Sequence, residues 1–181
     1  MLGAILVAVP LGILTGVISA LRRNSLTDYG LRLLVLTGGT VPNFVIGIAL
    51  IYLLLTRFSY TPPLQFIRFT DAPLENLAQF SWAVVILALR PLASISRLTR
   101  SQVLEVLNED YVRTASAKGL NRRIVVWRHV LPNAMAPVFG LMVTVIGSLV
   151  AGTVIVELLF SLPGMGRGLL LAIQNRDYPL V

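Results

Sequence analysis

The sequence contains no cysteine and a single histidine, His129, among its 181 residues. The missing thiols exclude disulfide bonds, thiolate catalysis and cysteine metal sites, and one histidine argues against a histidine-rich metal centre. Charged residues are also scarce, at 13%, against about 25% in a typical soluble domain. Neither paired carboxylates nor a nucleophile–base set is visible, so we expect no catalytic residue, no metal and no cofactor.

Long uncharged runs are what the sequence has instead, in a chain that is 56% hydrophobic. Residues 1–21 and 33–56 carry no charge, and a helix over the first run is about 31 Å long, close to the thickness of a bilayer core. Residues 130–156 form a third uncharged run, from which we predict a span over 134–158, whereas the predicted span 80–96 is weaker because Arg90 interrupts it. The runs lack the polar stripe of soluble helices, so we predict an all-α polytopic membrane protein with about four transmembrane helices in a single domain.

Positive charge is unevenly distributed between the connecting segments. Ten of the 15 Lys and Arg residues lie in segments 22–32 and 96–129, and four lie in the other connections. The positive-inside rule therefore places these two segments in the cytoplasm, and the net charge of +7 is explained without nucleic acid. The chain is then predicted to begin outside and to end on the apolar residues 178–181. We expect it to be the central part of a longer permease, with an earlier span and a final span absent from it.

Small residues and prolines mark special positions within these runs. Gly12 and Gly16 have the spacing that lets helices pack closely. Pro42 is expected to kink the second predicted span, because proline removes a backbone donor and disfavours helix at the residue before it.

The predicted cytoplasmic loop, 97–133, is long enough that we expect it to contain secondary structure. Asn108 is suited to cap a short helix whose first turn is acidic. Gly119 is suited to end that helix in the left-handed conformation. We predict a slim face on this helix, because its centre holds the small residue Ala115.

A second helix is predicted to begin at Asn121, to turn residues 124–127 toward the membrane, and to end at Pro132. Such a basic helical pair could be an interfacial hairpin that only anchors the loop, or a docking element for a cytoplasmic partner. A DNA-binding helix pair has a similar outline, but tethering between two spans argues against it.

The loop sequence resembles a known family signature. Residues 110–123 read DYVRTASAKGLNRR, and residues 128–133 read RHVLPN. They are similar to the cytoplasmic loop of binding-protein-dependent ABC importer permeases, in which EAA, three residues, Gly and nine residues precede I-x-L-P. The spacing from Gly119 to the Leu-Pro pair agrees, while Arg113 and His129 replace the leading Glu and the Ile. The form DYVRTA-x-AKGL is typical of the dipeptide/oligopeptide/nickel branch. Further matches are the segments 20–23, 97–101, 163–167 and 176–179.

The resemblance implies a permease subunit of an ATP-driven importer for peptides or related small solutes, in a bacterial or archaeal cytoplasmic (inner) membrane. It implies as partners a second permease subunit in a homo- or heterodimer, cytoplasmic ABC ATPase subunits that bind the ATP, an extracytoplasmic solute-binding protein and membrane lipids. Consistent with this, the sequence has no phosphate-binding P-loop of its own. The residues implied to couple to the ATPase, within 108–133, are Tyr111, Arg113, Ala115, Lys118, Gly119, Leu120 and Arg123.

Other functions remain alternatives at this point. A secondary transporter or channel subunit usually carries ionisable groups within its spans, and Arg90 and Glu157 are the two candidates. Arg90 is expected either to face the solute pathway or, as we favour, to serve the structure. A permease for nickel, glutathione or sugar would share the same loop, because the loop contacts the ATPase and not the cargo.

Overall fold

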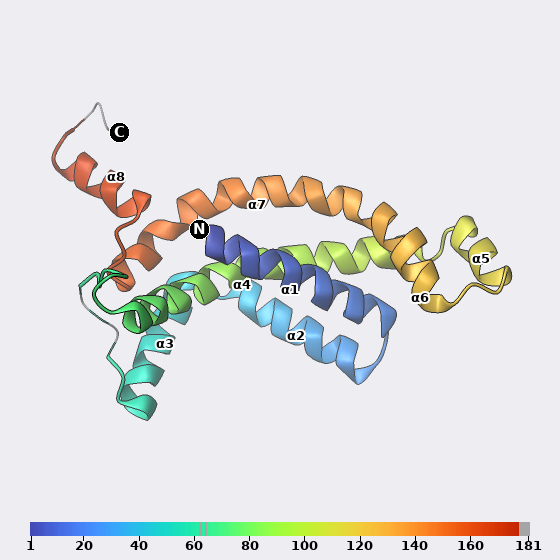
Figure 1. Ribbon diagram of the computed structural model, residues 1–181, viewed down its shortest axis with the longest axis horizontal. Helices are drawn as coiled ribbons and strands as arrows, with labels where there is room; N and C mark the ends of the chain where they lie inside the picture. Colours follow the sequence, from blue (N-terminus) through green and yellow to red (C-terminus); the bar gives the residue numbers. More distant parts are fainter. Residues whose placement is uncertain (62, 64, 178–181) are drawn as a thin grey trace. The chain divides into compact units, whose positions relative to one another are not determined.

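A computed structural model describes residues 1–61, 63 and 65–177 of the chain. Within these residues the regular structure is entirely helical (Figure 1), as predicted. The helices are α1 (Leu2–Leu21), α2 (Leu26–Thr40), α3 (Asn43–Phe58), α4 (Pro73–Val106), α5 (Asp110–Ala117), α6 (Arg122–Val125), a π-helical turn (Val126–Val130), α7 (Leu131–Leu159) and α8 (Met165–Gln174). Helix α8 begins at Met165, within the segment 163–167 that resembles the family, whereas the predicted apolar end at 178–181 lies outside the described residues.

Three helical stretches are long and apolar enough to cross a membrane, namely Leu2–Leu21, Pro73–Val106 and Arg122–Leu149. A fourth span results if α2 and α3 are counted together. The predicted uncharged run 33–56 is therefore not one straight helix, because it is interrupted between α2 and α3. Pro42 stands at the N-terminal cap of α3. The break follows from the missing N–H of this proline and from the steric restriction on the residue before it.

Helix α4 is much longer than the apolar run 80–96 that predicted it, since it begins at Pro73 and ends at Val106. Hydropathy marks only the apolar part of a helix, and the polar ends of α4 continue the same backbone hydrogen bonding. The predicted loop 97–133 thus starts inside a helix. Arg90 lies on α4 with its side chain exposed.

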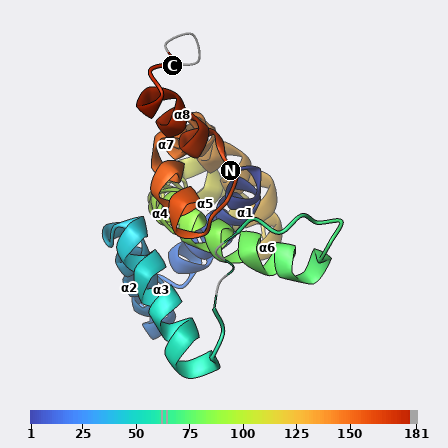
Figure 2. The ribbon, with the colours of Figure 1, turned by 90° about the vertical axis from the view of Figure 1, so that its left-hand side faces the viewer.

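The chain divides into two compact units, one formed by residues 1–5, 41–88 and 146–181 and the other by residues 6–40 and 89–145. In the first unit, the buried Gln79 side chain donates a hydrogen bond from Nε2 to the Phe160 carbonyl oxygen at 2.9 Å. Helix α8 follows the end of α7 through a short turn (Figure 2). The buried Glu157 carboxylate accepts a hydrogen bond from the backbone N–H of Arg167, in the first turn of α8, at 2.9 Å. This carboxylate therefore caps α8, where the helix dipole favours negative charge.

In the second unit, α1 lies against α4 with almost no space between the backbones (Figure 1). A Cβ atom built on Gly12 would lie 2.9 Å from the Ile95 side chain. One built on Gly16 would lie 2.6 Å from the Ser96 carbonyl oxygen. The predicted role of Gly12 and Gly16 in close helix packing is confirmed, because no side chain fits at either position.

Candidate functional site

The short helix α5 begins one residue later than predicted. Its N-terminal cap is Glu109, with no hydrogen bond from a capping side chain. The Asn108 side chain instead donates from Nδ2 to the Leu104 carbonyl oxygen at 2.9 Å. The prediction that Asn108 caps α5 was therefore wrong, because this amide satisfies a free carbonyl at the end of the preceding helix.

The end of α5 and the start of α6 agree with the sequence. Gly119 follows Lys118 with φ of +78°, a conformation that costs glycine little and most other residues more. Asn121 caps α6, since its side-chain oxygen accepts a hydrogen bond from the Arg123 N–H at 2.9 Å. Both predicted loop signals, at Gly119 and Asn121, are confirmed.

Pro132 does not end the second helix as predicted. Helix α6 passes through the π-helical turn Val126–Val130 into α7, and Pro132 is the second residue of α7. A proline ring collides with the carbonyl four residues before it in a regular α-helix. The wider π-helical turn just upstream provides the local adjustment that lets the chain continue as helix.

One side of α5 is buried against the ends of three long helices. Val112 and Ala115 are buried on this side. They belong to a hydrophobic cluster in the second unit, completed by Ala20 of α1, Val103 of α4, Val125 of α6, Val130 of the π-helical turn and Ala134 of α7. The small side chain of Ala115 lets α5 approach this cluster closely, in agreement with the slim face that the sequence predicted. The cluster therefore anchors the loop mechanically to α1, α4 and α7.

The opposite side of the loop is exposed and mixes cations with large apolar side chains. We name it the loop surface, and it consists of Tyr111, Arg113, Lys118, Leu120, Arg123, Ile124 and Trp127. Trp127 is 72% exposed. The polar contacts on this surface are weak, because the Arg113–Asp110 ion pair spans 3.7 Å between exposed groups and the Tyr111 hydroxyl lies 3.4 Å from the His129 carbonyl oxygen. Few contacts with the described residues therefore hold these side chains in place.

Residues 124–127 do not share one face as the sequence predicted. Val125 and Val126 are buried, while Ile124 and Trp127 are exposed. Helical geometry turns successive side chains by about a quarter-turn or more, so four consecutive residues cannot all face the membrane.

A groove of about 490 Å³ runs beside the loop surface, between α5 and α6. The groove is lined by the buried residues Val112, Val125 and Val126 and by the exposed residues Arg113 and Leu120. The groove is thus apolar inside and basic at its edge.

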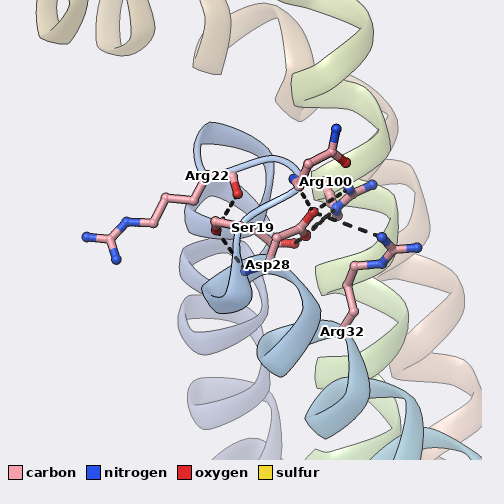
Figure 3. A network of polar contacts seen from close by, with 7 residues as sticks. Ser19, Arg22, Asp28, Arg32 and Arg100 are labelled. Carbon is pink, nitrogen blue, oxygen red and sulfur yellow. Dashed lines mark hydrogen bonds and ion pairs between the residues drawn. The ribbon is translucent and has the colours of Figure 1, made fainter.

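Sequence reasoning missed a buried ionic network at the turn between α1 and α2 (Figure 3). The Asp28 carboxylate is fully buried and accepts hydrogen bonds from Arg100 Nε at 3.0 Å and Arg100 Nη2 at 2.9 Å. It also accepts from the Ser19 hydroxyl and, at 3.1 Å, from the Asn24 backbone N–H. Figure 3 shows the Arg100 guanidinium directed at this carboxylate from α4, whereas Arg22 extends away from it. The sequence offered one indication of this network, because Asp28 is the single acidic residue among the arginines of segment 22–32.

Arg90, the other residue that the sequence singled out, lies apart from these sites along the chain. Within residues 1–61, 63 and 65–177, no hydrogen bond or ion pair of its side chain is present.

Comparison with known proteins agrees with these features. Residues 9–181 match the family described as binding-protein-dependent transport system inner membrane component. The chain is 38% identical over 178 residues to the dipeptide transport system permease protein DppB of Bacillus subtilis (strain 168), covering 98% of this chain and 55% of that protein. It is 42% identical over 200 residues to the di/tripeptide transport system permease protein DppB of Pseudomonas aeruginosa (strain UCBPP-PA14), covering 99% of this chain and 60% of that protein.

A third relative is the dipeptide transport system permease protein DppB of Escherichia coli (strain K12), which is 38% identical over 98% of this chain and 59% of its own length. The chain thus spans less than two thirds of the length of these relatives. The family match and the all-helical fold with several candidate spans lead to one identification: the chain belongs to the inner membrane components of binding-protein-dependent transport systems.

Proposed function

We propose that this chain forms the core of a transmembrane permease subunit in an ATP-driven importer of peptides. The observation that carries the proposal is the loop 110–130, which is anchored by buried residues on one side and offers exposed basic and apolar residues on the other. The names of the relatives, which refer to dipeptides and di/tripeptides, support peptides as cargo.

The loop surface is the proposed contact with a cytoplasmic ATPase subunit. Tyr111, Arg113, Lys118, Leu120 and Arg123 lie on this surface, and Gly119 forms the turn between its two helices. The groove beside α5 is suited to an apolar side chain of the partner, with Arg113 meeting an acidic group at its edge. Exposed cations steer such an encounter, while the burial of apolar groups supplies most of its stability.

Transmission of the movement would follow from the buried side of the loop. Val112 and Ala115 pack into the same cluster as Ala20 and Val103. A tightly packed cluster passes on a displacement instead of absorbing it. Closure of the ATPase pair would then move the ends of α1, α4 and α7 with α5, as a rigid-body transition between inward- and outward-facing states.

The remaining parts of the complex are proposed from the family. They are a second permease subunit, identical or homologous, ATPase subunits that bind ATP, and an extracytoplasmic solute-binding protein. The loop between α4 and α7 would face the cytoplasm, in agreement with its positive charge.

The test uses the full-length permease produced together with its second permease subunit, ATPase subunits and binding protein. Gly119→Asp should abolish ATP-dependent uptake of a labelled dipeptide and copurification of the ATPase. No atom lies within 4 Å of a Cβ at Gly119, and aspartate tolerates positive φ better than most residues. The variant should therefore alter the docking surface without disrupting the fold.

Gly168→Asp is the matched control, because Gly168 is also exposed with no atom within 4 Å of its Cβ but belongs to α8. It should retain the ATPase. Wild-type uptake and copurification in Gly119→Asp would refute the proposed docking role. Uptake driven by an ion gradient without the ATPase would instead favour a secondary transporter, and import of nickel, glutathione or sugar but not dipeptide would refute the assigned cargo.

A further inference from the structure

A second pocket in the same unit contains three arginine side chains and is not explained by docking of the ATPase. It measures about 260 Å³ and lies between the middle of α2 and the last third of α4. Arg32, Arg97 and Arg100 line it, together with the apolar residues Leu31, Val35 and Leu36 of α2. The combination of cationic and aliphatic walls indicates an amphipathic anionic ligand.

The positive charge of this pocket is only partly neutralised within the chain. Asp28 supplies one carboxylate, and its strong hydrogen bonds go to Arg100. Arg32 reaches the same carboxylate only at 4.0 Å. The exposed Arg97 side chain forms no hydrogen bond or ion pair with any residue among those described. Among the residues that the structure describes, three guanidinium groups therefore share one carboxylate, which leaves two positive charges uncompensated there.

The pocket lies beside the last turns of α1, which places it near the membrane interface. The Thr15 hydroxyl donates to the Ser96 hydroxyl oxygen at 2.9 Å, so the residues just before Arg97 lie beside the last turns of α1. The uncharged run of α1 ends at Leu21 and is followed by Arg22 and Arg23. This is the depth at which hydrocarbon gives way to lipid headgroups.

The Arg97 side chain extends toward the apolar part of α2. A Cβ atom built on Gly39 would lie 3.5 Å from Arg97 Nη1. An unpaired guanidinium at the edge of the hydrocarbon region is costly unless an anion or water accompanies it. Leu33 and Leu34, on the same helix, are 64% and 63% exposed, so acyl chains would cover the surface beside the pocket.

We propose that this pocket binds the headgroup phosphate of an anionic phospholipid. Arg97 and Arg32 donate hydrogen bonds to the phosphate oxygens, while Arg100 contributes charge and stays held by Asp28. The acyl chains lie along Leu31, Val35 and Leu36. Basic pockets between membrane helices bind anionic headgroups in this manner. The proposal depends on membrane insertion and is independent of the transported solute.

The test measures lipid retention by native mass spectrometry of the full-length permease complex, reconstituted with phosphatidylglycerol or with phosphatidylcholine. The wild-type complex should retain phosphatidylglycerol in preference to phosphatidylcholine. A hydrogen bond between a guanidinium and a phosphate oxygen contributes about a tenfold factor or more in affinity, which a cation outside the pocket does not supply. Arg32→Gln/Arg97→Gln should therefore lower the affinity for phosphatidylglycerol about 100-fold, and Arg97→Gln alone about tenfold. The single variant Arg97→Gln keeps the test valid if the double variant misfolds, because the Arg97 side chain has no hydrogen-bond or ion-pair partner among the described residues.

Arg22→Gln/Arg23→Gln is the matched control, since it removes two exposed cations from the same end of α1 without changing the pocket lining. It should weaken retention much less. Equal losses in the two double variants would overturn the proposal, because diffuse attraction to the membrane would then explain the binding. Equal retention of phosphatidylcholine, displacement of the lipid by inorganic phosphate at millimolar concentration, or displacement by a dipeptide would each overturn it as well.

Discussion

The replacement of Asp28 by asparagine removes one charge from the buried network and leaves the size of the side chain unchanged. The carboxylate is 0% exposed and accepts four hydrogen bonds, two of them from Arg100. Asparagine has one oxygen in place of two, and its amide group would face the donors of Arg100 or Asn24. The guanidinium would then be left close to a donor instead of its counter-ion.

The magnitude follows from the burial of the two partners. Removal of one member of a buried ion pair costs about 3–5 kcal/mol, because the other charge remains desolvated. The Arg100 side chain is still 20% exposed and keeps some contact with solvent. We therefore expect Asp28→Asn to lower the free energy of unfolding by about 3 kcal/mol, at the lower end of that range.

Unfolding of the full-length permease by sodium dodecyl sulfate in mixed micelles, followed by tryptophan fluorescence, measures this change. Asp110→Asn is the matched control, since the Asp110 side chain is 97% exposed and lies 3.7 Å from Arg113. Exposed ion pairs contribute little, so this variant should unfold like the wild type. Asp28→Asn/Arg100→Gln should lose less stability than the two single variants together, because it leaves no unpaired charge. Equal unfolding curves for Asp28→Asn and Asp110→Asn would refute the reasoning.

Two further predictions concern α1, α4 and α7. Gly16→Ala should lower the free energy of unfolding by about 1–3 kcal/mol through overpacking, because its Cβ would meet the Ser96 carbonyl oxygen at 2.6 Å. Gly140→Ala is the control, because no atom lies within 4 Å of the new Cβ. This variant should not lower the free energy of unfolding, since alanine favours helix. Identical effects of the two substitutions would contradict close packing at Gly16. Arg90→Leu should leave assembly of the complex intact on size-exclusion chromatography, because this exposed side chain has no described partner. Failure of the complex to assemble would show that Arg90 is needed at a subunit contact.

The sequence by itself determined the features that depend on neighbouring residues. Long uncharged runs predicted membrane helices, since the length and apolarity of a segment are local properties. Gly119 and Asn121 predicted the turn and the second cap of the loop, and both are present as expected. The role of the loop residues in coupling stays a prediction, because it depends on a partner.

Tertiary structure decided the features that depend on residues distant in sequence. Asp28 and Arg100 are 72 residues apart, and neither side chain reveals its partner without the packing of α1, α2 and α4. The same holds for Val125 and Trp127, which a hydrophobic run treats alike, although one is buried in a cluster and the other is exposed. Local pattern predicts that a helix forms and where it turns, whereas the burial of a side chain and the compensation of its charge follow only from the elements that fold around it.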